Sequence, residues 1–304
     1  MEIMPVGNQM TLSSCSLSAT SRLFSSSVFR EMAEKGRSAL FARLIKKTPL
    51  IENLDAIDRV GDAFDAALNI LRRGNQRDEY VYKAALTRNI LLGKHSLRTA
   101  SMLREFRVGK CKADLAILNG TATVYEIKSE RDSLSRLETQ IAAYMQVFAK
   151  VFVIAGENHI DAVLDRTPQE IGVMCLSKRH NISTLRDATD CPERVSPLMI
   201  LGSVRADEAK LILQRLGVEV PQVPNTLLRA ELRLAFEKLE PALAHRAMVD
   251  VLKRTRDLLP LEELLQNLPS SLQAAVCSVP LKRRDHERLV RTVNTPILEA
   301  LSWA

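Results

Sequence analysis

The sequence is poor in aromatic residues, glycine and proline. Aromatic residues make up 4% of the 304 residues, and the chain has 11 glycines and 12 prolines. These low contents, with 46% apolar residues, favour long helices of Leu, Ala, Arg and Glu around a sizeable core. The scarcity of aromatics also argues against a platform that stacks the bases of a single nucleic-acid strand. At this length the chain has room for two domains, since a typical domain has roughly 100 to 200 residues.

The chain lacks the patterns of several other protein classes. Its five cysteines are widely spaced and no signal peptide is recognisable, so we expect no disulfide framework and a reducing, cytoplasmic environment. No apolar run approaches the roughly 18 residues needed to span a bilayer, and we expect no membrane partner. The five histidines lack partners at zinc-ligand spacing, and the cysteines lack the compact spacing of an iron–sulfur cluster. A glycine-rich phosphate loop is also absent.

Charge and patterning divide the chain into four segments. Residues 1–27 form a Ser-rich tail that we expect to be disordered, with an organellar transit peptide as the alternative. Residues 28–76 show helical spacing and predict a helical arm. Residues 77–185 alternate helices and strands, and residues 190–304 return to helical patterns without a motif. The last segment is expected to be a helical domain that forms a homodimer or binds a protein partner.

Basic residues are concentrated in the first part of the central segment, residues 77–112. The whole chain carries a net charge of +7, which by itself indicates only solubility or a polyanionic partner. Residues 77–112, however, hold nine Lys or Arg against three acids, whereas residues 113–185 hold seven bases and nine acids. The basic stretch leads directly into a group of carboxylates, which is the arrangement that a phosphate-binding cleft needs.

The order of elements in the central segment predicts an α/β fold. We expect a helix over residues 80–92 and another over 133–148, with strands over 102–108, 113–118, 121–128, 151–155 and 172–176. A helix, three strands, and then alternating helices and strands are typical of a mixed central sheet flanked by helices rather than of a helix bundle.

Polar residues stand out in the two strands that Asn119 and Gly120 connect. Asp114 lies near the start of one strand, and Glu126 and Lys128 end the next. A two-residue loop at Asn119-Gly120 would place Asp114 and Glu126 on opposite faces. A three-residue loop over residues 118–120, with Gly120 in the left-handed region, would pair Ile117 with Thr121 and bring both carboxylates and Lys128 to one face. Asn-Gly suits both turns; we expect the three-residue loop or an equivalent bulge.

Asp114 followed by Glu126-x-Lys128 on adjacent strands resembles the signature of the PD-(D/E)XK nuclease superfamily. Gln140 and Tyr144, on the next helix, look like the Gln-x-x-x-Tyr element of its RecB-like branch. The run from Glu79 through Glu105 to Lys128 is further similar to a bacterial family of uncharacterised predicted nucleases. The resemblance covers roughly residues 77–180 and implies a restriction-endonuclease-like core. Ala113 stands where the signature has proline.

The residue types fit a metal-dependent hydrolysis. Two carboxylates and one main-chain carbonyl suffice for Mg²⁺ or Mn²⁺ when waters and a substrate phosphate complete the shell. Asp114, Glu126 and the carbonyl of Ile127 would be these ligands, with Glu79 and Glu105 as further candidates. Lys128, on the strand face of Glu126, would orient the attacking water and stabilise charge on the phosphate. An ordinary surface Glu-Lys pair is the structural alternative.

The helix over residues 133–148 supplies the other catalytic candidates. Gln140 and Tyr144 are four residues apart and therefore share a helix face. Gln140 would contact the water or a phosphate, and Tyr144 would help to position the substrate backbone. Tyr144 can equally belong to the core stripe of this helix. Candidate phosphate contacts, each of which can instead be a solvated charge, are Lys83, Arg107, Lys110, Lys112 and Arg136.

These observations predict a nuclease that hydrolyses phosphodiester bonds. DNA is expected over RNA from the habits of the superfamily, and a basic surface poor in aromatics suits contact with a duplex backbone. The alternative is a nucleic-acid-binding or assembly protein that keeps the fold without the reaction. Genome defence and DNA repair are both compatible with the sequence.

Overall fold

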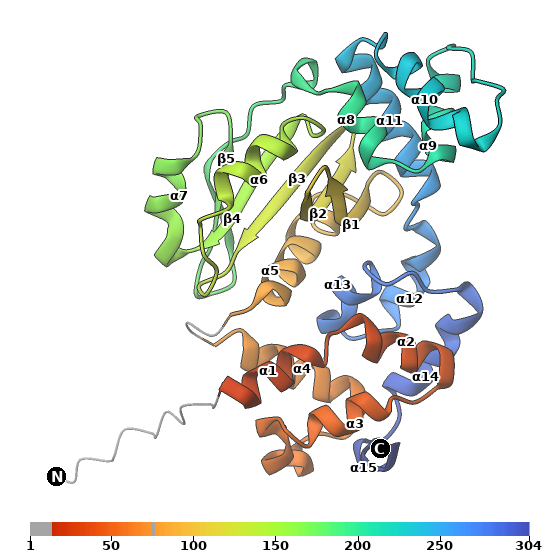
Figure 1. The fold of residues 1–304 in the computed structure, drawn as a ribbon. Helices are drawn as coiled ribbons and strands as arrows, with labels where there is room; N and C mark the ends of the chain where they lie inside the picture. The colour runs from red at the N-terminus through yellow and green to blue at the C-terminus, as the bar shows by residue number, and fades with distance from the viewer. Residues whose placement is uncertain (1–13, 74–76, 304) are drawn as a thin grey trace.

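The computed structural model describes residues 14–73 and 77–303, and its centre is a six-stranded mixed sheet (Figure 1). The strands lie side by side in chain order. Neighbours from β1 to β3 are antiparallel, β3, β4 and β5 are parallel, and β6 is antiparallel to β5. The expected mixed α/β fold is therefore confirmed. The strands are β1 (Ser101–Val108), β2 (Cys111–Asn119), β3 (Thr121–Lys128), β4 (Lys150–Gly156), β5 (Gly172–Leu176) and β6 (Ile182–Arg186).

One face of the sheet packs against helices that lie between its later strands or follow its last strand in the sequence. These helices share a core with the strand residues Val124 and Val153. The face is covered by α6 (Leu137–Tyr144), α7 (Ile160–Arg166), α8 (Pro197–Ser203), α9 (Ala206–Arg215), α10 (Asn225–Phe236) and α11 (Pro241–Thr255).

The other face of the sheet packs against α5 (Glu79–Leu86), which begins the α/β segment. The side chain of Asp78 accepts a hydrogen bond from the backbone N–H of Val81 at 3.3 Å, which caps the helix start. A short π-helical stretch, Thr87–Leu91, continues α5 towards β1. This arrangement carries Glu79 to the end of the sheet at which Asp114 lies.

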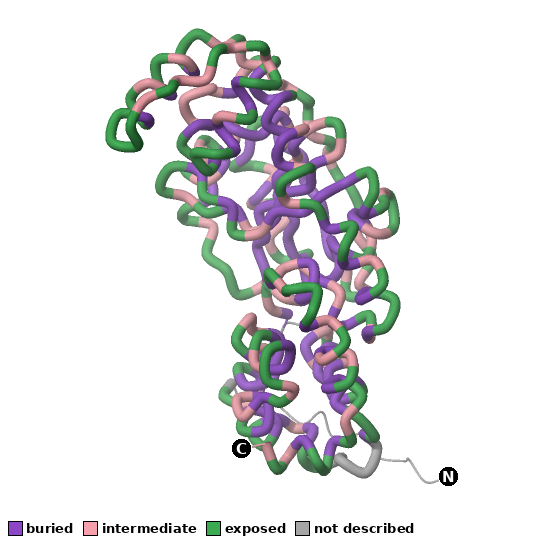
Figure 2. Tube along the Cα trace, turned by 90° about the vertical axis from the view of Figure 1, so that its right-hand side faces the viewer, coloured by how far each residue is buried: buried purple, intermediate pink, exposed green. Residues whose placement is uncertain are grey.

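Helices from the N-terminal and C-terminal parts of the chain pack together in one helical body below the sheet (Figure 1). Helix α14 packs along α2, and the backbone N–H of Ile297 donates to the carbonyl of Asp58 at 2.9 Å. One cluster of buried residues extends from the sheet into this body, and Figure 2 shows buried segments in both parts. Its helices are α1 (Ser14–Arg22), α2 (Ser26–Lys35), α3 (Ala39–Ile45), α4 (Val60–Leu71), α12 (Glu262–Gln266), α13 (Gln273–Val276), α14 (His286–Val293) and α15 (Ile297–Ala300).

The helical segments at the beginning and end of the chain thus pack on each other, although they are far apart in the sequence. The described residues 28–73 of this arm form helices as expected, but these helices pack on the last helices of the chain. The helices after residue 190 divide between two places: α8 to α11 cover the sheet, and α12 to α15 join the N-terminal helices.

The expectation of a disordered tail over residues 1–27 is wrong for residues 14–27. Helix α1 forms from Ser14, and Leu23 and Phe24 are buried. The Phe24 ring stacks on Tyr80 with 4.1 Å between the ring centroids. These tertiary contacts stabilise a Ser-rich helix whose own propensity is modest. Residues 1–13 of the expected tail lie outside the described residues.

The hairpin between β2 and β3 brings the polar residues to one face. Asn119 pairs with Thr121 and Leu118 with Ala122, so that Gly120 stands at the tip with a φ of 71°. The expected left-handed Gly120 and the shared face are confirmed. The expected pairing of Ile117 with Thr121 is wrong, because Ile117 pairs with Thr123. The observed partner of Ile117 lies two positions from the expected one, so every side chain stays on its expected face of the sheet. The turn is tighter than expected, and the pairing of the two strands therefore continues closer to Gly120.

Replacing Gly120 by alanine should lower the free energy of unfolding by about 1 kcal/mol, because a Cβ is disfavoured at a positive φ. An added Cβ would meet nothing within 4 Å, so the cost comes from the backbone alone. Urea unfolding would measure the change. An unchanged midpoint would contradict the left-handed turn.

Strand β1 contains an irregular residue beside the polar face. Glu105 has a φ of 49°, which is unusual for a residue with a side chain. Leu103 and Phe106 consequently face the same core although they are three positions apart. The irregularity turns the side chain of Glu105 out of the normal alternation of the strand.

Among the described residues, no helix has the length and apolar character that crossing a membrane requires.

Candidate active site at the end of the sheet

A cavity of about 490 Å³ opens where β2 and β3 meet the N-termini of α5 and α6. It collects residues from strands and helices that are far apart in the sequence. Its acidic lining residues are Glu79, Asp114, Glu126 and Asp132, and its other candidate site residues are Lys110, Lys112, Ile127, Lys128, Arg136 and Gln140.

Glu126 is the most buried member of the site. The residue is 1% exposed, and both oxygens of its carboxylate accept hydrogen bonds. Oε1 accepts from Lys128 Nζ at 2.8 Å and from the Gln140 side-chain amide, and Oε2 accepts from the Tyr144 hydroxyl at 2.8 Å. A buried carboxylate requires such partners, because an unpaired charge in a protein interior is costly. The network fixes the orientation of Glu126.

Lys128 and Gln140 hold each other in place. Lys128 is 5% exposed, and its Nζ donates to Gln140 Oε1 at 2.9 Å as well as to Glu126. An ammonium group has three donors, so one remains for a group in the cavity. Gln140 therefore positions Lys128 and Glu126, whereas the sequence had suggested direct contact with a water or a phosphate.

Asp114 lies beside this network with fewer partners. Its Oδ2 accepts a hydrogen bond from the backbone N–H of Ile127 at 2.9 Å. Burial and the nearby carboxylates of Glu126 and Glu79 raise the pKa of Asp114 to about 7. Asp114 thus holds a proton more tightly than an ordinary aspartate, and a carboxylate perturbed by burial and by neighbouring carboxylates is a property of cation-binding and catalytic sites.

Tyr144 belongs to the support of the site rather than to its lining. The side chain is fully buried, and its hydroxyl contacts Glu126 Oε2 and the carbonyl oxygen of Lys112 at 3.0 Å. Burial and the carboxylate of Glu126 raise the pKa of Tyr144, so the hydroxyl stays protonated and donates. Tyr144 thus takes the core position that the sequence left open as its alternative, because the helix turns the ring into the core.

Replacing Tyr144 by phenylalanine should reduce the free energy of unfolding by about 1–2 kcal/mol, because the ring would remain packed but Glu126 Oε2 would lose its donor inside the protein. Urea unfolding would measure the effect. A variant with wild-type stability would show that this hydrogen bond does not stabilise the fold.

The remaining candidates separate into a rim and two outlying groups. Lys110, Lys112 and Arg136 line the mouth of the cavity and are exposed, which suits contact with phosphates. Arg107 is exposed on β1 and is not among the residues that line this cavity. Lys83 forms an ion pair with Glu79 and lines a second, larger cavity.

Glu105 does not join the carboxylates of the site. Its carboxylate forms an ion pair with Lys112 Nζ at 2.8 Å, and it lines the larger cavity instead. The left-handed backbone at Glu105 turns the side chain away from Asp114, which no pattern in the sequence indicates. The sequence-based suggestion of Glu105 as a metal ligand is therefore not supported by its position, whereas Glu79 does line the cavity of Asp114.

The donor set fits a hard divalent cation that keeps part of its water shell. Among the described residues, no three His, Cys, Asp or Glu side chains come together as a complete metal cage. Mg²⁺ is commonly bound by one or two carboxylates, with waters and substrate phosphates as its other ligands. Asp114 and Glu126, with Ile127 and Glu79 at the same cavity, provide oxygen atoms of the required kind.

Two supporting contacts had no signal in the sequence. Asp132 Oδ2 accepts hydrogen bonds from the backbone and the hydroxyl of Ser129, at 2.8 and 2.7 Å, and fixes the loop after β3. Arg77 and Glu130 form a buried ion pair, and the Tyr82 hydroxyl donates to Glu130 Oε2 at 3.1 Å. These residues tie that loop to α5. Arg77 and Glu130 are far apart in the sequence, so their contact could not be predicted. The Ser-x-x-Asp spacing of residues 129–132 is visible in the sequence but was not used.

The fold and the site define an α/β protein with a carboxylate–lysine cavity at the end of a mixed sheet. The family described as Bacteriophage P4 protein cII matches residues 72–259. This range is more than half of the chain, and the chain therefore belongs to this family. The match spans the sheet, α5 and the helices α6 to α11, and most of the helical body lies outside it.

Two individual proteins resemble parts of the chain. Protein cII of Enterobacteria phage P4 is 29% identical over 133 residues, which are 42% of this chain and 50% of that protein. The chain thus spans about half the length of this curated relative. A solved structure of a protein of unknown function from Silicibacter pomeroyi aligns with 31% of this chain and 62% of that chain, at 19% identity and a TM-score of 0.25. A similarity at this level does not establish a common fold.

Proposed function

We propose that this protein is a metal-dependent nuclease of the PD-(D/E)XK type that hydrolyses phosphodiester bonds in DNA. The observation that carries the proposal is the convergence of Asp114, Glu126 and Lys128 in one cavity. Their spacing in the sequence required a particular hairpin register, and β2 and β3 have a register that brings them together. Gln140, from a separate helix, is bonded to two of the three.

Asp114 and Glu126 would hold Mg²⁺ or Mn²⁺, with the Ile127 carbonyl and Glu79 as further oxygen donors. Such a cation, when bound, lowers the pKa of its water and neutralises charge on a phosphate. It would also relieve the repulsion between the two carboxylates that raises the pKa of Asp114.

Lys128 would act on the substrate through the donor that its partners leave free. Its ammonium group can hydrogen-bond a non-bridging phosphate oxygen or the attacking water, and it stabilises the negative charge that develops during the reaction. Gln140 and Tyr144 keep this group and Glu126 at fixed positions. Lys110, Lys112 and Arg136 at the rim would bind neighbouring phosphates and align the strand.

A non-catalytic nucleic-acid-binding or assembly protein is the second candidate. The observation in its favour is that both oxygens of Glu126 already have donors within the protein. A carboxylate engaged in this way can serve to stabilise the fold. The uneven distribution of partners favours the nuclease, because Asp114 is not compensated in the same way.

The proposal extends to the setting in which the protein acts. DNA is favoured over RNA by the superfamily resemblance, and the cysteine pattern favours the cytoplasm. Genome defence and repair both fit a nuclease that lacks a recognisable motor or nucleotide-binding motif of its own. A homodimer or a protein partner would bind through the helices after residue 190.

A plasmid-cleavage assay separates the two candidates. Supercoiled DNA would be incubated with the wild type, Asp114→Ala and Lys128→Ala in Mg²⁺, in Mn²⁺ and in excess chelator. The nuclease predicts nicked or linear DNA only with the wild type and a metal. Equal behaviour of the three proteins in every condition would eliminate the active site.

A further inference from the structure

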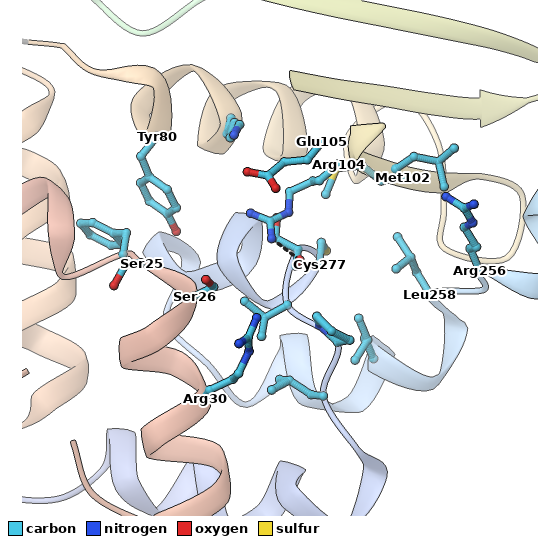
Figure 3. A pocket seen from close by; sticks show the side chains of 18 of the residues that line it. Ser25, Ser26, Arg30, Tyr80, Met102, Arg104, Glu105, Arg256, Leu258 and Cys277 are labelled. Atoms are coloured by element: carbon cyan, nitrogen blue, oxygen red, sulfur yellow. Dashed lines mark hydrogen bonds between the residues drawn. The ribbon is translucent and has the colours of Figure 1, made fainter. Parts of the chain in front are cut away.

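A second cavity lies next to the candidate active site. It encloses about 990 Å³ between strand β1, the helix α2 and the segment around Cys277. Glu79 lines both cavities, and the ion pair between Glu105 and Lys112 joins a residue of one to a residue of the other. Figure 3 shows Arg104 and Arg30 entering this cavity from opposite walls. We call it the arginine groove.

The groove is named for its arginine side chains, which come from the N-terminal helices, from strand β1 and from the segment after residue 190. They are Arg22, Arg30, Arg104, Arg205, Arg256 and Arg283. Only one of the six, Arg256, has an ion pair among the described residues, with Glu208. The groove has four acidic lining residues, Asp78, Glu79, Glu105 and Asp257, of which Glu79 and Glu105 are paired with lysines. Its six arginines and Lys83 outnumber these four acids, so the lining carries a net positive charge.

Arg104 shows the clearest need for a ligand. Its guanidinium donates to the carbonyl of Ser278, while its Nε is buried without a hydrogen-bond partner among the described residues. A buried guanidinium donor without an acceptor is costly. The arrangement suits an anion with several oxygen atoms, since guanidinium groups bind phosphates with paired hydrogen bonds.

The size and the other lining residues limit the kind of anion. About 990 Å³ is at the upper end of small-ligand sites, so the groove can hold a few nucleotides but not a double helix. Aliphatic side chains such as Met102, Leu258 and Val279 also line it and offer surfaces for bases. The ring of Tyr80 is already stacked on Phe24, and its hydroxyl donates to Ser271, so it is not free to stack on a base.

From these contacts we infer that the arginine groove binds the phosphate backbone of an unpaired strand that adjoins the phosphodiester in the active site. The inference rests on the proposed nuclease function for the identity of the polyanion. It adds a preference for DNA with a single-stranded extension. Binding in the groove is mainly electrostatic and therefore depends strongly on salt.

Binding of a fluorescent single-stranded oligonucleotide would test this inference without any need for cleavage. In metal-free buffer, the double variant Arg30→Gln/Arg283→Gln should bind about tenfold more weakly than the wild type. Loss of two phosphate contacts should also reduce the slope of log K against log salt by about 1.4. Both arginines are exposed, so the substitutions leave the buried contacts of Arg104 intact. The control, Arg229→Gln/Arg246→Gln, removes the same charge from exposed positions on α10 and α11.

Three outcomes would overturn the inference. They are wild-type affinity in the groove variant, an equal loss in the control, and a loss confined to blunt duplex DNA. Groove-dependent binding by a protein that fails to cut DNA would refute the nuclease and keep the groove. If instead the wild type and the groove variant cut a blunt duplex at the same rate and bind the single strand equally well, the groove inference would be refuted and the nuclease proposal would stand.

Discussion

Replacing Lys128 by methionine is expected to slow phosphodiester cleavage about a thousandfold. The side chain of methionine nearly matches the length of lysine but cannot stabilise negative charge on a phosphate, and removal of one such electrostatic contact costs about 10²–10³ in rate. Glu126 would keep its hydrogen bonds from Gln140 and Tyr144. Single-turnover cleavage of a labelled duplex measures the chemical step separately from product release.

Two further measurements make this prediction specific. DNA affinity should change little, because Lys128 is buried and the exposed rim residues supply most phosphate contacts. The control variant Lys94→Met removes an exposed lysine from another part of the surface and should cleave at the wild-type rate. A Lys128→Met protein that is folded and cuts at a comparable rate would exclude a catalytic lysine here.

Asp114→Asn is expected to stabilise the metal-free protein at pH 8 while abolishing cleavage. The pKa of Asp114 in the folded protein is about 7, whereas that of an unfolded aspartate is about 4. Between these values the native state binds the proton more tightly, so the free energy of unfolding of the wild type falls as pH rises from about 4 to about 7. Asparagine has no charge to lose and can still accept the hydrogen bond from Ile127.

The expected gain at pH 8 is up to about 4 kcal/mol, which corresponds to a rise of several degrees in Tm. The difference between the two proteins should become small near pH 4 and disappear below about pH 3, where the wild-type carboxyl is protonated in both states. Added Mg²⁺ should stabilise the wild type and narrow the gap, because a ligand of the native state raises its stability. Asp165→Asn, at an exposed position on α7, is the control. A gap that does not change with pH would contradict the burial of an uncompensated carboxylate.

The sequence predicted the strands of the site closely because their patterns are local. Residues rich in β-branched and aromatic side chains set the bounds of β3, which runs from Thr121 to Lys128 as expected. The turn at Gly120 was anticipated from Asn-Gly, but the pairing was not. Two registers of the same parity place the side chains on the same faces, so hydrophobic alternation cannot distinguish them.

The contacts between distant segments could not be predicted. The Ser-rich helix α1 packs on α3 and α4, and Phe24, just after the helix, packs on Tyr80. Strand β6 forms at the edge of β5, where its own alternation is weak. The left-handed Glu105 follows from a local irregularity in the β1–β2 pair and not from its residue type. The arginine groove likewise needs residues from both ends of the chain, which the sequence does not show to be neighbours.

The rate of DNA cleavage by Glu126→Gln, compared with Glu138→Gln, tests the central proposal most directly. Both changes remove one negative charge without altering size. Glu126 lies buried in the cavity, whereas Glu138 is exposed on α6, two residues before Gln140. The proposed active site predicts Mg²⁺-dependent cleavage by the wild type and Glu138→Gln, and its loss in a folded Glu126→Gln protein. Equal cleavage by both variants, or none by any protein including the wild type, would contradict it.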